Sequence, residues 1–433
     1  MYRYTLIGTE LSLYTGKIKT YLQWKGVPFD VMLPSDDIYR KILIPRAGIA
    51  MIPVLLIYSN DDDISTGSFT TLQDTKDIMD YFETTYPAPK RYSSLLATPM
   101  QHPIVPRTPQ RAFAAQLMEL LADEWLVTQA MYWRWYEPHL AKQWKFLAAE
   151  FGNSSTGGLA TTASQQEIGG KRMAKFAGFT PGLGVSDTTS PALEWQFREL
   201  LKLMEEHFDR FPFLLGNEIS LADFAFWGPF GPHLGRDPVP SFIIKTTAPA
   251  VWEWVERVNS CHRWGGQFVS AAGSTASSYG TSKPHADRLN EDGDELPGTT
   301  SKILSFLLND YSKVLLTTVE RTAQYIAKKG GDKIALPRSL GEHLFALSGP
   351  EGDCEATRRA QTHCVWELDR IIARSKLSSA DRTLIDWLQS VCGPATADIV
   401  GKAFDIWLST GRRIEREQAA LVAVLSSGHI SKL

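Results

Sequence analysis

The segment FLLGNEISLADF, residues 213–224, carries the most specific structural signal in this chain. Ser220 and Asp223 have the spacing of a capping box. In such a box the serine hydroxyl accepts from the backbone N–H three residues later, and the acidic side chain accepts from the N–H of the serine. The pattern predicts that a helix begins at Ser220. Its role is structural, and loss of the Asp223 carboxylate is expected to cost about 1 kcal/mol or more.

The sequence on both sides of this box has the periodicity of helices. Ala112–Trp135 is one long apolar-periodic stretch, and Leu193–Phe208 places its apolar residues on one helical face. Gly152–Thr162 is rich in glycine, serine and threonine and predicts a mobile loop. We therefore expect an all-helical domain over residues 110–270.

Residues 1–86 alternate between strand-like and helix-like segments. The predicted order is βαβαββα, which implies a small mixed sheet with helices on its faces. Strands are expected at residues 4–8, 29–33, 52–58 and 64–69, and helices at 16–25, 36–44 and 74–86. The turn Asn60–Asp63 joins the last two strands as a hairpin.

Two irregular segments divide the chain into three domains. Residues 87–109 contain six prolines and predict an extended linker, and residues 271–298 are polar and glycine-rich and predict a second linker. Residues 299–433 predict an additional helical domain without strand-like alternation. Leu336–Gly341 is expected to break a helix there. The position of this domain suggests a lid or an interface.

The composition is that of a globular protein. The 433 residues are 43% hydrophobic and 21% charged, with a formal net charge of −3. No basic stripe indicates nucleic-acid binding, and no apolar run approaches the roughly 18 residues needed to cross a bilayer. The four cysteines and nine histidines lack metal-ligand spacing, so no metal is expected.

Glu10-Leu11-Ser12-Leu13-Tyr14 lies at the turn from the first strand into the first helix. Together with the capping box and the segments at Pro53 and Asp74, it makes residues 1–265 resemble the glutathione transferases. In serine-type members a serine here donates a hydrogen bond to the glutathione sulfur, so the resemblance implies Ser12 as the catalytic residue. A hydroxyl donor at a helix N-terminus favours the thiolate, which is the nucleophile. The alternative is that Ser12 only caps the helix.

The glutathione-binding residues implied by the resemblance are Ile52, Pro53, Asp74 and Thr75. The family has a cis peptide before the proline, and the backbone of the preceding residue pairs with the peptide part of glutathione. Asp74 and Thr75 would hold the γ-glutamyl end at the start of a helix. From the residues alone, Pro53 begins a strand and Asp74 caps a helix. The spacing between Pro53 and Asp74 is longer than usual for the family.

Candidates for the second-substrate site come from the same resemblance. The family binds its electrophile between the two halves, beside the loop after strand one and the first long helix of the helical domain. Tyr14, Trp125, Trp133 and Arg134 occupy those places. The number of aromatic side chains among them suits a flat or hydrophobic electrophile. The alternative is that aromatic residues at helical spacing form the core. The absence of cysteine before Cys261 excludes cysteine-type chemistry in the first half.

The resemblance implies an enzyme with glutathione as co-substrate. The thiolate would attack a hydrophobic or aromatic electrophile in conjugation, and peroxide reduction, isomerisation or ether cleavage could use the same thiolate. A homodimer is compatible with the family. The alternative from another class is a non-catalytic binding or assembly module that keeps the transferase fold.

The sequence ends in Ser431-Lys432-Leu433. In eukaryotes this C-terminal tripeptide is an address read by the peroxisomal import receptor. We therefore expect a peroxisomal location, with the cytoplasm as the alternative.

Overall fold

The computed structural model describes residues 2–48, 51–59, 67–86, 103–159, 161–260, 293–330, 335–378, 380–412 and 414. The two predicted linkers are described only near their C-terminal ends. Asn60–Asp63, Cys261 and Ser431–Leu433 lie outside the described residues.

Residues 2–85 have the predicted βαβαββα order and form a thioredoxin-like domain. Its elements are β1 (Tyr2–Ile7), α1 (Leu13–Lys25), β2 (Asp30–Met32), α2 (Asp36–Ile38), η1 (Tyr39–Ala47), β3 (Val54–Ser59), β4 (Thr70–Gln73) and α3 (Thr75–Thr85). The four strands lie in the order β2-β1-β3-β4. β1 is parallel to β2 and antiparallel to β3, which is antiparallel to β4. The hairpin partner of β3 lies later than predicted, and Thr71 and Leu72 are its buried residues.

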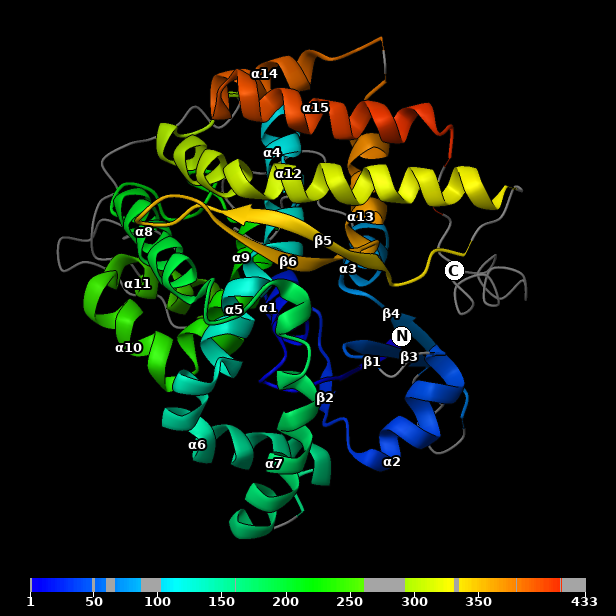
Figure 1. Cartoon of the computed structure of the whole chain (residues 1–433). Coiled ribbons are helices and arrows are strands. Elements are labelled where there is room, and N and C mark those ends of the chain that lie inside the picture. The colour runs from blue at the N-terminus through cyan, green and yellow to red at the C-terminus, as the bar shows by residue number, and fades with distance from the viewer. Residues whose placement is uncertain are drawn as a thin grey trace, which may run out of the picture.

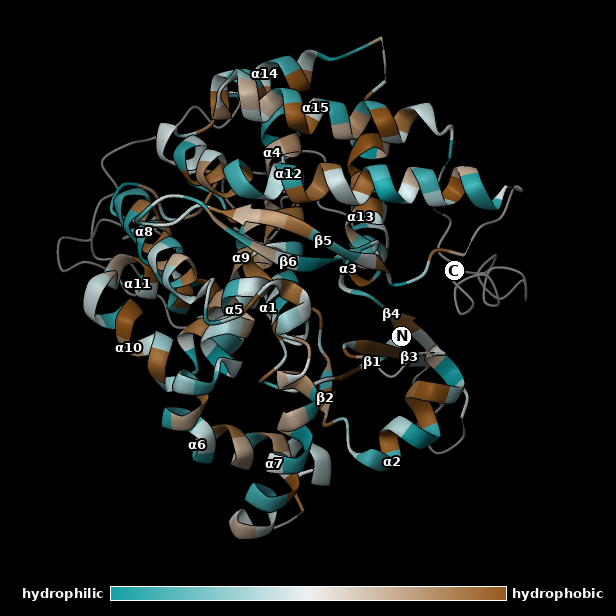
Figure 2. Cartoon of the chain, in the orientation of Figure 1, coloured by the Kyte–Doolittle hydropathy of each residue, from teal (hydrophilic) through white to brown (hydrophobic). Residues whose placement is uncertain are grey.

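Helices cover both faces of this sheet. Leu6 and Leu55 belong to the main core with α1 and α3, whereas Ile7 and Leu56 pack against η1 in a separate cluster. This alternation is the period-two pattern of a strand that is buried on both sides. Figure 2 shows the result as strongly hydrophobic colour on β1, whereas α12 and α15 alternate between hydrophilic and hydrophobic residues.

The second part of the chain is helical, as predicted. Its elements are α4 (Pro109–Glu124), α5 (Leu126–Trp135), α6 (Glu137–Thr156), α7 (Thr162–Ala177), η4 (Pro181–Leu183), α8 (Ser190–Phe208), α9 (Leu221–Pro229), η5 (Phe230–Gly235), α10 (Pro238–Thr247) and α11 (Pro249–Ser260). The predicted continuous helix over Ala112–Trp135 is two helices that break at Trp125. The Trp125 ring packs there against Tyr311 and Phe345 of the third part of the chain.

The predicted mobile loop at Gly152–Thr162 is partly wrong, because α6 continues through Gly152 to Thr156. A Cβ atom on Gly152 would lie 1.8 Å from the carbonyl oxygen of Gln165 in α7, and one on Gly169 would lie 1.8 Å from the carbonyl oxygen of Ala148 in α6. The glycines therefore permit a close helix crossing. Composition alone does not distinguish that use of glycine from a loop.

The capping box that opens α9 is confirmed. The buried Asp223 carboxylate accepts from the backbone N–H groups of Ser220 and Leu214, each at 2.9 Å, and from the indole N–H of Trp254 at 3.0 Å. The Ser220 hydroxyl also donates to it at 3.1 Å. Asp223 thus joins α9 to the preceding turn and to α11.

The residues after 293, which we call the extension, form α12 (Gly298–Lys329), β5 (Ser339–Leu347), β6 (Cys354–Gln361), α13 (His363–Ser375), α14 (Thr383–Cys392) and α15 (Pro394–Ser409). The expectation of helices alone was wrong here, because β5 and β6 pair as an antiparallel hairpin. The alternation of buried His343, Phe345 and Leu347 with more exposed neighbours is the strand signal that was missed.

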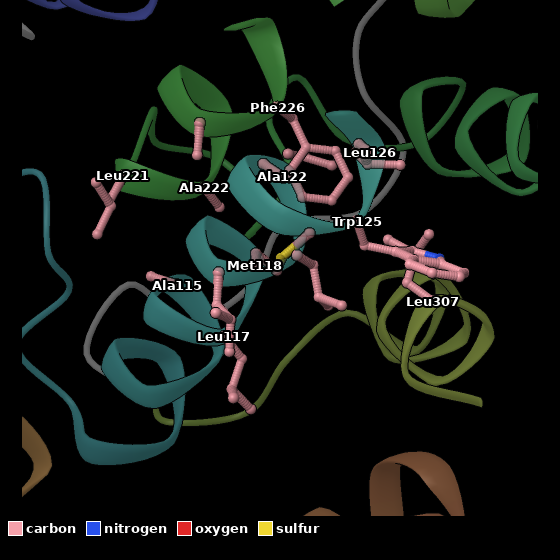
Figure 3. Close-up of a cluster of buried hydrophobic side chains, with 14 of the residues drawn as sticks. Ala115, Leu117, Met118, Ala122, Trp125, Leu126, Leu221, Ala222, Phe226 and Leu307 are labelled. Carbon is pink, nitrogen blue, oxygen red and sulfur yellow. The ribbon is translucent and has the colours of Figure 1, made fainter. Parts of the chain in front are cut away.

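The extension shares one core with the transferase-like part. α4 lies between α9 and the extension and contacts α12, α13 and α14 (Figure 1). Figure 3 shows Trp125, the residue after α4, beside Leu307 of α12, while Ala122 of α4 lies near Phe226 of α9. Phe113 of α4 makes edge contacts with Trp387 and Phe404 of the extension. The extension is therefore packed as a layer of the protein.

We expect Asp223→Ala to lower the free energy of unfolding by roughly 3 kcal/mol, because two backbone N–H groups and the indole N–H of Trp254 would lose a buried charged acceptor. Ser220→Ala is the matched control. The Ser220 hydroxyl bonds only within the box, so its loss is expected to cost about 1 kcal/mol. Urea unfolding followed by circular dichroism measures both, and equal small losses would contradict the role assigned to Asp223.

Candidate functional site

The strand register brings the three predicted glutathione-site segments to one edge of the sheet. Ile7, the last residue of β1, pairs with Val54, the first residue of β3, which pairs with Gln73, the last residue of β4. The turn that contains Ser12 follows β1, Ile52–Pro53 precedes β3, and Asp74 follows β4. All three segments therefore leave the sheet at the same end.

Ser12 is the N-cap of α1 and is half-buried. Its Oγ accepts from the backbone N–H of Thr15 at 3.2 Å. Capping uses the hydroxyl oxygen as an acceptor, which leaves the O–H hydrogen to be donated to another group. The capping role and the proposed catalytic role of Ser12 are thus chemically compatible.

The turn before Ser12 is held by Arg134, which was predicted to contact the second substrate. Its Nη1 donates to the carbonyl oxygen of Leu11 at 2.8 Å, and its Nε and Nη2 form a two-pronged ion pair with Asp237 at 2.7 and 2.8 Å. Further contacts to Pro232 and His233 engage the remaining donors of the buried guanidinium. Arg134 is therefore a support for the Ser12 turn.

The peptide bond between Ile52 and Pro53 is cis, as the resemblance implied. The β1–β3 ladder begins at Val54, so Ile52 lies just outside it with its side chain half-buried. The backbone of Ile52 is consequently placed at the same edge as Ser12.

Asp74 is the N-cap of α3 and has φ 84° and ψ 139°, a conformation that non-glycine residues rarely adopt. Its carboxylate accepts from the backbone N–H of Lys76 at 3.0 Å. Thr75 is buried behind it. Such strain is retained where the surrounding structure over-determines it and is frequent at functional sites.

A network of buried charges lies behind this edge. Lys17 of α1 contacts Glu119 at 2.8 Å and Asp123 at 2.7 Å in α4. Lys76 of α3 contacts Asp123 at 2.5 Å and Glu367 of α13 at 2.9 Å. Burial opposes ionisation of Glu119, but Lys17 and Lys76 outweigh it and lower the pKa of Glu119 to about 2.

His363, the first residue of α13, joins the network to Asp74. Its Nδ1 lies 2.8 Å from Glu124 and 3.1 Å from Glu367, and its Nε2 lies 3.6 Å from Asp74. Burial disfavours the charged imidazole, but the interactions with these three carboxylates prevail and raise the pKa of His363 well above its ordinary value.

Three side chains of this network could hold a metal ion. Donor atoms of Glu124, His363 and Glu367 lie within 4.8 Å of one another. The Lys76 ammonium already lies 2.9 Å from Glu367 and would repel a divalent cation there. The geometry thus fits an ion-pair network better than a metal site.

The other second-substrate candidates lie in or near the core. Trp133 is buried against His139 and Phe197, and Trp125 is buried against the extension. Tyr14 is half-buried and donates to the carbonyl oxygen of Asp123 at 3.1 Å. Trp125, Trp133 and Arg134 fill packing positions in this structure, and their role in an electrophile site stays a prediction.

Lys17, Lys76, His363 and Glu367 were not predicted as members of the site. Two signals were available: a lysine close after each predicted site serine or aspartate, and the i, i+4 spacing of His363 and Glu367. Neither signal identifies the partners, which are distant in sequence.

Comparison with known proteins agrees with this architecture. Residues 6–90 match the family model for the glutathione S-transferase N-terminal domain, and residues 192–257 match that for the C-terminal domain. No curated protein matches the sequence. Two segments of the chain are thus similar to the N-terminal and C-terminal domains of glutathione S-transferases.

Solved structures similar to this chain include transferases with bound ligands. One is a glutathione S-transferase of Methylobacterium radiotolerans in complex with glutathione sulfonate, at 16% identity over 66% of this chain and 100% of that chain, with TM-score 0.33. Another, from Methylobacillus flagellatus with glutathione bound, has 16% identity over 58% and 93%, with TM-score 0.31. FzlA of C. crescentus has 16% identity over 62% and 96%, with TM-score 0.32.

None of the helices within the described ranges has the length and apolar character that crossing a bilayer requires.

We expect stability to fall as the pH rises above 6.5, and to fall less in His363→Gln. The folded pKa of His363 is raised above its unfolded value of about 6.5. Its contribution is therefore complete below pH 6.5 and is lost as the pH rises through the folded pKa. Burial raises the pKa of Glu367 to about 7, so its ionisation lowers stability with the same sign from about pH 4.5 to 7.

Urea unfolding of both proteins from pH 6.5 to 9 measures this difference. Parallel stability profiles would show that the charge on His363 does not stabilise the folded state.

Proposed function

We propose that this protein binds glutathione at the sheet edge formed by Ser12, Ile52–Pro53 and Asp74–Thr75, and that it promotes reaction of the glutathione thiolate. The observation that carries the proposal is the convergence of these three segments through the pairing of Ile7, Val54 and Gln73. The two matched transferase domains support it.

Each segment has a distinct task. The Ser12 hydroxyl donates to the sulfur, and the positive end of the α1 dipole further favours the anion. The Ile52 backbone, outside the strand ladder, pairs with the peptide part of glutathione. Asp74 accepts from the α-ammonium of the γ-glutamyl end, and the N-terminus of α3 receives its α-carboxylate.

The reaction proposed first is conjugation. The thiol loses its proton to solvent, the sulfur forms a bond to an electrophilic carbon, and the leaving group departs with the displaced electron pair. Peroxide reduction, isomerisation and ether cleavage would start from the same thiolate. The tryptophans that suggested an aromatic electrophile, Trp125 and Trp133, lie in the core. The proposal therefore specifies the thiolate and leaves the class of electrophile open.

The alternative function is a non-catalytic binding or assembly module. It is favoured by two contacts in which the extension borders the proposed site. His363 faces Asp74, and the guanidinium of Arg338 contacts the sulfur of Met51, next to Ile52. These contacts place side chains of the extension where a ligand would reach the sheet edge.

We expect Ser12→Ala to bind glutathione with its thiol protonated at neutral pH. Loss of the hydroxyl donor should raise the thiol pKa by about two units, which corresponds to roughly 2.7 kcal/mol. Calorimetric titration of glutathione from pH 6 to 9, in buffers of different ionisation enthalpy, gives the number of protons released. Ser12→Thr should restore proton release because it retains the hydroxyl.

Ser35→Ala is the matched control, because Ser35 also caps a helix, accepting from the N–H of Ile38 at 3.4 Å. It should leave proton release unchanged. If glutathione binds neither the wild type nor the variants, the proposed enzymatic function is rejected and the non-catalytic module is favoured.

We also propose peroxisomal import through Ser431–Leu433, with the import receptor as partner. The tripeptide lies outside the described residues, so the proposal rests on its sequence. A fluorescent protein fused to the N-terminus should accumulate in peroxisomes of eukaryotic cells, and deletion of Ser431–Leu433 should return it to the cytoplasm. Identical distributions would reject the signal.

A further inference from the structure

The extension reaches the proposed glutathione site through the beginning of α13. His363 follows the end of β6 at Gln361, and the hairpin lies along the transferase-like part in Figure 1. His363 Nε2 lies 3.6 Å from Asp74 Oδ2. A residue of the extension therefore stands beside the carboxylate that is proposed to hold the γ-glutamyl end.

His363 is the most solvent-accessible member of its charge cluster. Its side chain is 35% exposed, compared with 12% for Asp74 and 8% for Glu124. The corresponding values are 4% for Lys76 and 1% for Glu367. A ligand bound at the N-terminus of α3 would therefore contact the imidazole of His363 more readily than the buried charges of Lys76 and Glu367.

The two ring nitrogens of His363 differ in how closely they contact carboxylates. Nδ1 lies within hydrogen-bonding distance of Glu124 and Glu367. The 3.6 Å separation between Nε2 and Asp74 Oδ2 is longer than a hydrogen bond. A ligand oxygen could therefore accept the Nε2 proton at the cost of this longer ion pair alone.

Asp74 and the imidazolium of His363, which both lie at the N-terminus of α3, have opposite charge. The γ-glutamyl end of glutathione carries an α-ammonium and an α-carboxylate on one carbon. Asp74 complements the ammonium, whereas an imidazolium complements the carboxylate and adds a charge-assisted hydrogen bond to the N-terminus of α3. An adjacent cation and anion are the pattern that recognises a zwitterionic amino-acid group.

We propose that His363 is a glutathione-binding residue that the extension supplies, with Nε2 donating to the α-carboxylate of the γ-glutamyl end. This inference rests on the proposed function of the Asp74–Thr75 turn. It assigns the extension a part in specificity, because the transferase-like domains alone would lack this cation.

The groups around His363 determine how binding depends on pH. Asp74 faces it from the start of α3, Glu124 from α4 and Glu367 from its own helix, with Lys76 of α3 and Asp123 of α4 behind them. Three carboxylates favour the charged imidazole, and Lys76 partly offsets them. Affinity should therefore weaken when the pH rises far enough to deprotonate His363.

The test uses the full chain and S-methylglutathione, which lacks a free thiol and so separates this contact from any role of Ser12. Calorimetric titration compares wild type with His363→Gln from pH 6 to 9. We expect the variant to bind about tenfold more weakly at pH 6, the loss typical of one charge-assisted hydrogen bond. The difference should shrink as the pH rises. S-methylcysteinylglycine, which lacks the γ-glutamyl end, should show no difference between the proteins.

Arg374→Gln is the matched control. It removes a cation from the same helix, where Arg374 pairs with Asp80 of α3, away from the Asp74 turn. Its affinity for S-methylglutathione should equal that of wild type, whereas an equal loss in both variants would assign the effect to docking of α13.

Each outcome bears on one proposal or on both. If His363→Gln binds as tightly as wild type or more tightly, His363 is not a ligand, while glutathione binding by the transferase-like part stands. If the His363 effect is present but Ser12→Ala releases its proton normally, the thiolate mechanism fails and the His363 contact stands. If wild type does not bind S-methylglutathione, both proposals are overturned.

Discussion

The buried ammonium of Lys76 is the contact on which the three parts of this protein depend. It lies in α3 of the thioredoxin-like half and pairs with Asp123 of the helical half and Glu367 of the extension. A buried charge is tolerated only when it is paired, and removal of one partner from such a pair typically costs about 3–5 kcal/mol. Lys76 therefore supplies the cation that carboxylates of the helical half and of the extension both contact, which restricts how the three parts can dock.

This network also bears on function, because it anchors the helices that begin at the candidate site. Lys17 holds α1 five residues after Ser12, and Lys76 holds α3 two residues after Asp74. Both lysines converge on Asp123 of α4. The orientations of the Ser12 hydroxyl and of the Asp74 side chain thus both depend on the carboxylate of Asp123. Arg134 additionally holds the turn before Ser12 through the carbonyl oxygen of Leu11.

The packing of the extension changes how the transferase fold is used here. Trp125, which in the sequence suggested a substrate pocket, contacts Tyr311 and Phe345 of the extension. The surface of α4 that would otherwise meet solvent or another subunit is part of a continuous core. The extension therefore stabilises the fold and, through His363, stands at the edge of the site.

The sequence by itself determined the local features: the βαβαββα order, the capping box of Ser220 and Asp223, and the placement of Ser12, Pro53 and Asp74 at element boundaries. These depend on periodicity and on backbone chemistry within a few residues. The tertiary structure alone decided which side chains meet. Gly152 is a helix contact because Gln165 approaches it, Arg134 is structural because Asp237 is buried beside it, and His363 joins the site from 289 positions after Asp74. Pairing of charges and glycines across helices depends on distances that no local pattern encodes.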